Sequence, residues 1–153
     1  MLLWRVNRLE LKKSILEKLD AMNNYLQELE EMLPEDVEYS RNLRARRACE
    51  KTIELVIEQV IDICSMIVSH QKLGIPHSED DLITVLVKKK ILTPKLAEKI
   101  KVMKGFRNIL VHKYGEIDDQ QVYYFLTTEL DDFGLFEKEI KLFLGSHYAR
   151  SKK

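Results

Sequence analysis

The chain has 153 residues, which is enough for one domain with a modest hydrophobic core. Charged residues make up 33% of it and only 5 glycines and 3 prolines interrupt it, which favours long helices over a many-stranded sheet. The 25 basic and 25 acidic side chains cancel, so the molecule lacks the strong positive field that gathers nucleic acid without specificity. Any contact with RNA must therefore be local, and no DNA binding is expected.

The N-terminal residues and the cysteines indicate a compartment. Arg5 and Arg8 follow the first apolar residues almost at once, which excludes the apolar core of a signal peptide. No stretch has the roughly twenty uncharged apolar residues that a membrane span needs. Cys49 and Cys64 lie too far apart along one predicted helix to form a disulfide. These features predict a cytoplasmic protein with free thiols and no membrane contact.

Apolar residues predict two long helices in the N-terminal half. In the first, which should end near Pro34, they recur at alternating steps of four and three residues along one helix face. The second should run from about Ser40 to His70 and carries two adjacent apolar stripes, which indicates two packing partners. The first helix presents Ile15, Leu19, Met22, Leu26, Leu29 and Leu33; the second presents Ala45, Cys49, Ile53, Val56, Val60, Ile63 and Ile67, with Ile57, Ile61, Cys64 and Val68 beside them.

Two shorter helices should follow the turn at Gly74 and Pro76. Ser78 precedes three acidic residues and an apolar run, which is the pattern of a capped helix start. Thr93 and Pro94 are typical of an N-cap and a first helical residue, because proline has no N–H to lose there.

The last predicted helix opens at Asp118 and Gln121, which are spaced as in a capping box, and continues to Gly145. With no repeat or linker between the helical patterns, the expected fold is all-α. We expect one domain over residues 1–145, an up-and-down bundle of about five helices, followed by a flexible tail at residues 146–153.

One short segment gathers the polar groups that could carry chemistry. Arg107, Asn108, His112 and Tyr114 surround an apolar triplet, and Gly115 follows them. On a straight helix Asn108 and His112 share a face, whereas Arg107 and His112 diverge by about 140°. Either the helix ends near His112, which Gly115 favours, or the side chain of Arg107 reaches around it.

An arginine beside a histidine suits phosphodiester chemistry. Histidine can donate or accept a proton near neutral pH, and the arginine fork can hold a phosphate by two contacts. In RNA the 2′-hydroxyl is an internal nucleophile, so an acid–base group and a cation can suffice without metal or cofactor. The alternative is structural: Arg107 pairs with a surface carboxylate, Asn108 caps a neighbour, and His112 neutralises the end of its own helix.

The run from Gly105 to Tyr114 resembles the signature of the HepT-like proteins of the HEPN family: arginine, a polar residue, three positions, histidine, any residue and tyrosine. The likeness extends over roughly residues 5–145. It implies a helical bundle that dimerises so that two arginine–histidine pairs face one cleft, and an activity that cleaves RNA such as tRNA or mRNA. Arg107 and His112 then take the catalytic roles, and Asn108 assists them.

The resemblance also implies a toxin–antitoxin pair. The partner would be a cognate minimal nucleotidyltransferase antitoxin that transfers AMP from ATP to the motif tyrosine, which is Tyr114 here. A bulky anion so close to His112 would block the cleft and occupy the positive charge that an RNA phosphate needs.

A basic cluster at the start of the second helix is a weaker signal. Positive charge is unfavourable at that end of a helix dipole, which invites a contact with RNA or with an acidic antitoxin surface, although a solvated helix face is the favoured explanation. We interpret His70 and His77 as structural and expect no metal site. The cluster comprises Arg41, Arg44, Arg46 and Arg47.

Two other functions stay open from the sequence. The chain could be a non-catalytic helical module that docks with a separate nucleotidyltransferase or presents substrate to it. It could also be a purely structural helical dimer.

Overall fold

The computed structural model describes residues 2–112 and 117–150, with side chains from residue 7 to 112 and from 117 to 146. It contains seven helices and no β-strand within these ranges, which confirms the predicted all-α fold. The helices are α1 (Leu2–Met32), α2 (Asp36–Arg41), α3 (Leu43–His70), α4 (Glu79–Lys88), α5 (Pro94–Val111), α6 (Asp119–Thr128) and α7 (Asp131–Arg150).

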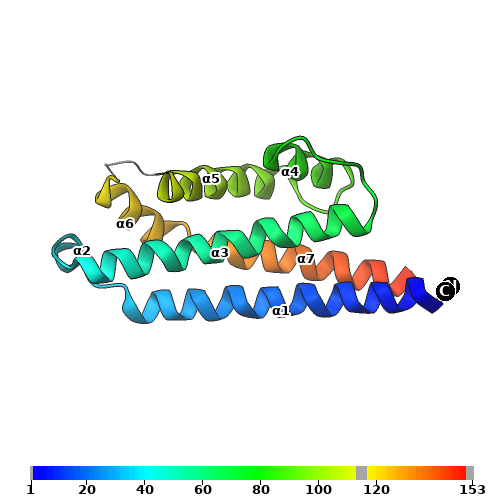
Figure 1. The fold of residues 1–153 in the computed structure, drawn as a ribbon, viewed down its shortest axis with the longest axis horizontal. Coiled ribbons are helices and arrows are strands. Elements are labelled where there is room, and N and C mark those ends of the chain that lie inside the picture. The colour runs from blue at the N-terminus through cyan, green and yellow to red at the C-terminus, as the bar shows by residue number, and fades with distance from the viewer. Residues whose placement is uncertain (1, 113–116, 151–153) are drawn as a thin grey trace.

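The long helices lie lengthwise and alternate in direction (Figure 1). α3 contacts α1 on one side and α4 and α5 on the other, and α5 also contacts α7. The short helix α4 packs beside α5, with its first residues against the C-terminal half of α5, whereas α6 and α2 lie close to where α5 stops (Figure 1). The up-and-down arrangement therefore brings α2, the start of α3 and α6 to the end of the bundle that carries the motif.

The core follows the predicted stripes. Every residue of the two stripes of α3 is buried except Ala45, and α3 contacts helices on both sides, so the prediction of two packing partners is confirmed. The predicted seam is buried at Ile15, Leu19, Met22 and Leu29 of α1, and it is partly buried at Leu26 and at Leu33, which directly follows α1. Burial of this apolar surface is the main stabilising contribution to the bundle.

Three predicted N-caps are confirmed. The Ser78 hydroxyl accepts a hydrogen bond from the Asp81 N–H at 3.0 Å, and that of Thr93 accepts one from the Leu96 N–H at 3.3 Å. Asp118 accepts from two N–H groups in the first turn of α6, at 3.0 and 3.4 Å. Each cap determines the residue at which its helix starts, because its side chain accepts hydrogen bonds from backbone N–H groups that have no partner within the first turn.

The helix predicted from about Ser40 to His70 is present, but the short helix that precedes it was not predicted. A separate helix, α2, occupies Asp36–Arg41, and α3 starts at Leu43. Asn42 between them has extended backbone, with φ −105° and ψ 95°, and its side chain accepts from the Ala45 N–H at 3.0 Å. An asparagine that caps its own following turn interrupts the helix at that position.

The prediction of one helix from Asp118 to Gly145 was wrong, because the segment forms α6 and α7 with a break after Thr128. The hydroxyls of Thr127 and Thr128 bond back to carbonyls one turn earlier, which weakens the end of a helix. Asp131 and Asp132 then provide the acidic first turn that favours a new start.

At its other end α7 continues beyond Gly145 to Arg150. The domain bounds of 1–145 and the flexible tail stay predictions. None of the helices, over the residues described, is long and apolar enough to cross a membrane.

Both cysteines are free and buried, as predicted. Burial, together with the nearby Glu50 carboxylate, raises the pKa of the Cys49 thiol to about 11. Burial raises the pKa of the Cys64 thiol to about 12.

We predict that neither thiol reacts with Ellman's reagent in the folded protein at pH 8, and that both react in about 6 M guanidinium, because only the accessible thiolate is a nucleophile. Rapid colour development without denaturant would contradict the packing of α3.

Candidate active site

The motif lies at the C-terminal end of α5. The helix ends at Val111, and His112 is its C-cap, with φ −99°, ψ 23° and a backbone N–H that donates to the Asn108 carbonyl at 2.9 Å. Of the two geometries that the sequence left open, the structure shows the helix ending at His112. The His112 side chain is exposed there, at the end where a helix dipole favours positive charge.

Arg107 is held in place by two acceptors. Its Nη2 donates to Oε1 of Glu79, at the start of α4, at 2.5 Å, and its Nε donates to Oδ1 of the neighbouring Asn108 at 3.2 Å. Only 14% of the Arg107 side chain is exposed. Arg107 and Asn108 are therefore in direct contact, and the pairing with a carboxylate that the structural alternative expected is present.

A second ion pair lies beside this one. Lys104 Nζ donates to Oδ1 of Asp80 at 2.6 Å, one turn before Arg107 on α5 and one residue after Glu79 on α4. Two successive acidic residues of α4 thus hold two basic residues on one face of α5. The sequence indicated Glu79 and Asp80 only as part of a capped helix start, so these pairings were missed; their separation along the chain gives no local signal.

Aromatic contacts fix α6 next to the motif. The ring of Phe106 stacks on that of Phe125 with centroids 4.1 Å apart and planes 8° apart, which joins α5 to α6. The ring of Tyr123 packs against that of Tyr39 in α2, with centroids 5.2 Å apart, and the Tyr123 hydroxyl donates to the Pro34 carbonyl at 3.1 Å. The helix after the motif is therefore anchored to α5, to α2 and to the turn after α1.

The structure divides the four predicted arginines into two pairs. Arg46 Nη1 donates to the Ser40 carbonyl, and its Nε lies 3.4 Å from Oδ2 of Asp119 in an ion pair without hydrogen-bond geometry. Arg47 donates to the buried Glu50 carboxylate at 2.8 Å. The guanidinium groups of Arg41 and Arg44 are exposed, and no ion pair joins either of them to another described residue. Arg41 and Arg44 are thus accessible to a ligand, and the paired Arg47 side chain is 55% exposed.

Tyr114, the expected AMP acceptor, lies outside the described residues. It falls in the interval 113–116, between the end of α5 and the start of α6. His70 and His77 flank the turn before α4, where Gly74 adopts a φ of 108°. No group of three or more potential metal ligands occurs in the described part of the chain.

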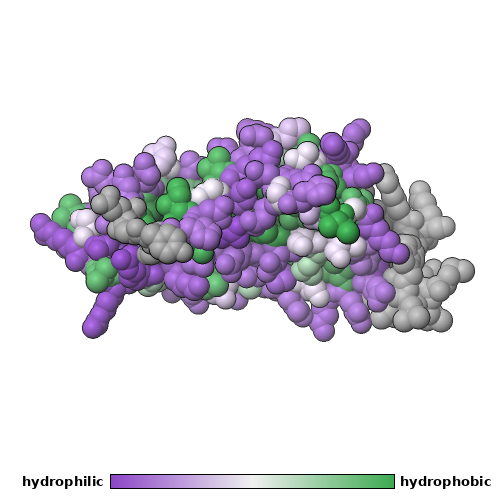
Figure 2. All heavy atoms as spheres, turned by 45° about the horizontal axis from the view of Figure 1, so that its top comes forward, coloured by the Kyte–Doolittle hydropathy of each residue, from purple (hydrophilic) through white to green (hydrophobic). Residues whose placement is uncertain are grey.

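Exposed apolar side chains lie on the same helix as the motif. Val102, Ile109 and Val111 of α5 are 58%, 54% and 47% exposed. Figure 2 shows hydrophobic side chains at the surface among hydrophilic ones on the face that carries α4 and α5. Val102 and Ile109 are two turns apart and share one side of the helix.

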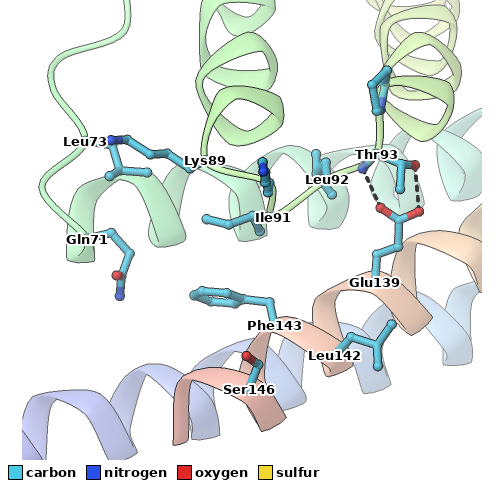
Figure 3. Close-up of a pocket in the computed structure, with 12 residues that line it drawn as sticks. Gln71, Leu73, Lys89, Ile91, Leu92, Thr93, Glu139, Leu142, Phe143 and Ser146 are labelled. Carbon is cyan, nitrogen blue, oxygen red and sulfur yellow. Dashed lines mark hydrogen bonds between the residues drawn. The ribbon is translucent and has the colours of Figure 1, made fainter. Parts of the chain in front are cut away.

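A hollow of about 800 Å³ lies at the opposite end of α5 (Figure 3). Apolar residues of the α4–α5 turn and of α7 are part of its lining. At its edge the Glu139 carboxylate accepts hydrogen bonds from the Thr93 N–H at 2.7 Å and from the Thr93 hydroxyl at 2.9 Å. Since α5 has 18 residues, the hollow lies roughly 27 Å from His112 along the helix. It belongs to the packing of α5 on α7 and not to the motif.

Comparisons with known proteins converge on one family. A family model described as ribonuclease HepT-like matches residues 22–140. The chain is 30% identical over 130 residues to the tRNA nuclease HepT of Aphanizomenon flos-aquae (strain 2012/KM1/D3), over 83% of this chain and 87% of that protein. It is 28% identical over 127 residues to the mRNA nuclease HepT of Shewanella oneidensis, over 83% of this chain and 96% of that protein.

A solved structure has the same fold. It is described as a tri-AMPylated Shewanella oneidensis HEPN toxin in complex with MNT antitoxin. The TM-score is 0.78 at 27% sequence identity, and the match covers 84% of this chain and 96% of the other.

Proposed function

The chain belongs to the HepT-like ribonuclease family, and on that premise we propose that it is the toxin of a toxin–antitoxin pair, an endoribonuclease that cleaves tRNA or mRNA. The observation that carries the proposal is the arginine, asparagine and histidine set at the exposed end of α5, with Arg107 bonded to Asn108. Relatives named as tRNA and mRNA nucleases support this substrate class. The buried free thiols and an RNA substrate support a cytoplasmic location.

Arg107 and His112 have distinct roles in the proposed reaction. The 2′-oxygen of the ribose attacks the adjacent phosphorus and the bond to the 5′-oxygen breaks, which leaves a 2′,3′-cyclic phosphate and a 5′-hydroxyl. Arg107 neutralises the charge that grows on the phosphate oxygens, while His112 side chains accept the proton of the 2′-hydroxyl and donate one to the leaving 5′-oxygen. Asn108 holds the Nε of Arg107 and orients its fork toward the phosphate.

A homodimer completes this site. The exposed apolar side chains of Val102 and Ile109 give α5 a surface that a second copy can cover. With the α5 helices of two copies side by side, the two His112 side chains face one cleft, where one accepts the proton and the other donates it.

Arg41 and Arg44 extend the site along the RNA backbone or meet an acidic antitoxin surface. They flank the start of α3, which the Arg46–Asp119 ion pair ties to the start of α6 directly after the motif. Arg41 also lines a hollow of about 270 Å³ together with Asp119 and Gln120. Exposed arginines at the same end of the bundle as the motif supply the local positive charge that the neutral chain lacks as a whole.

The proposed control is AMP transfer to Tyr114 by a cognate minimal nucleotidyltransferase antitoxin. The AMPylated toxin structure with its antitoxin supports it. An AMP group two residues from His112 adds a bulky phosphodiester anion that competes with the RNA phosphate for Arg107.

We predict that His112→Ala or Arg107→Ala lowers the rate of tRNA or mRNA cleavage by at least about 100-fold, because each removes the proton carrier or the phosphate cation. The assay uses purified chain with unmodified Tyr114 and follows RNA on denaturing gels. His70→Ala, at the opposite end of α3 from the motif, should cleave as the parent does. Intact RNA with the parent chain, or equal cleavage by His112→Ala, would favour a docking module.

We also predict that co-expression with the neighbouring nucleotidyltransferase adds whole AMP units to the intact mass and abolishes RNA cleavage. Tyr114→Phe should remove the mass gain, since the acceptor oxygen is lost. Tyr124→Phe is the matched control, because Tyr124 is 63% exposed on α6 and lies outside the motif. A mass gain that persists in Tyr114→Phe would place the modification elsewhere.

A further inference from the structure

The Glu79 carboxylate accepts one of the hydrogen bonds that the guanidinium of Arg107 donates. Arginine carries five N–H groups in a planar fork, and here one is donated to Glu79 and one to Asn108. These two contacts fix the plane of the fork and its rotation about Nε. The remaining N–H groups keep the geometry that holds a phosphate by two parallel hydrogen bonds.

The position of Glu79 is itself rigid. It is the first residue of α4, directly after the Ser78 cap, where a negative charge is favoured by the helix dipole. Leu82, Ile83 and Leu86 bury the other face of α4 in the core. A carboxylate on a packed helix start holds a partner more accurately than one on a loop.

The surrounding contacts distinguish Glu79 from an ordinary surface ion pair. The Arg107 side chain is 14% exposed and that of Glu79 is 36% exposed, so the pair is partly shielded from water. The adjacent Asp80–Lys104 pair already joins α4 to α5 one turn away. Glu79 therefore contacts Arg107 in addition to a link that already exists between the two helices.

We propose that Glu79 is a positioning residue, whose carboxylate holds the Arg107 guanidinium in the orientation that binds the scissile RNA phosphate. This inference rests on the proposed ribonuclease function. Glu79 touches neither the phosphate nor the reacting atoms and acts only through Arg107.

The test compares kcat and KM for RNA cleavage in variants at Glu79. Glu79→Ala lowers kcat/KM by about ten- to hundredfold, since a displaced cation costs that much in rate. Glu79→Gln keeps an acceptor oxygen and recovers part of the loss. In an Arg107→Ala background, Glu79→Ala has no further effect, because the residue through which it acts is gone.

Asp80→Ala is the matched control. It removes the neighbouring ion pair between the same two helices and leaves kcat/KM within about threefold of the parent. All variants are assayed well below their melting temperatures. Equal losses in Asp80→Ala and Glu79→Ala, or a further loss in the double variant, would overturn the positioning role and leave a structural one.

A second measurement does not depend on cleavage. In NMR spectra of protein with ¹⁵N-labelled arginine, the Nη groups of Arg107 give separate signals because the fork cannot rotate, and Glu79→Ala merges them. Merged signals in the parent chain overturn the proposal. If the parent cleaves RNA and Glu79→Ala cleaves it equally well, the positioning role alone is overturned. If the parent does not cleave RNA, the ribonuclease function and the positioning role both fail.

Discussion

The ion pair between Glu79 and Arg107 connects the fold to the chemistry. α4 begins where the Ser78 cap and an acidic first turn set it, and its buried face locks it against the core. Its first two residues then bind Arg107 and Lys104 of α5. On the other side Phe106 stacks on Phe125 of α6. The C-terminal half of α5 is thus held from two directions, and His112 lies at its exposed end in a defined place.

The distribution of charge explains how a chain with no net charge can act on RNA. Several arginines and lysines are paired within the fold, as Arg46 is with Asp119 and Arg47 with Glu50. Arg41 and Arg44 are the members of their cluster whose guanidinium groups are exposed without an ion pair to the described residues. Arg107 keeps donors free although it is paired. These guanidinium groups supply local positive charge, whereas the neutral chain as a whole has no strong positive field that would gather nucleic acid without specificity.

Much of the fold followed from local signals in the sequence. The caps at Ser78, Thr93 and Asp118 set three helix starts because short polar side chains bond to N–H groups nearby. The two apolar stripes of α3 predicted that other helices pack against two of its sides. Two helix breaks were not predicted, and local side-chain contacts cause both. Asn42 caps the start of α3, and Thr127 and Thr128 weaken the end of α6. Each of these residue types favours caps and turns, so the signals were present but weaker than the apolar pattern.

The site was predictable in part. The motif and the end of α5 near His112 could be inferred from spacing and from Gly115. The carboxylate partners of Arg107 and Lys104 could not, because they depend on how α4 packs against α5 across a long interval of sequence. The same holds for the division of the arginine cluster, since Arg46 is tied to α6 only once the bundle has formed.

The chemical ends of the cleaved RNA test the central claim most directly. The chain is incubated in excess EDTA with a short RNA that contains one preferred cleavage position, and the products are analysed by mass spectrometry. Attack by the 2′-hydroxyl under Arg107 and His112 predicts a 2′,3′-cyclic phosphate and a 5′-hydroxyl, and no cleavage when that 2′-hydroxyl is replaced by hydrogen. Products with a 3′-hydroxyl and a 5′-phosphate, or unchanged cleavage of the deoxy-substituted strand, would contradict the account.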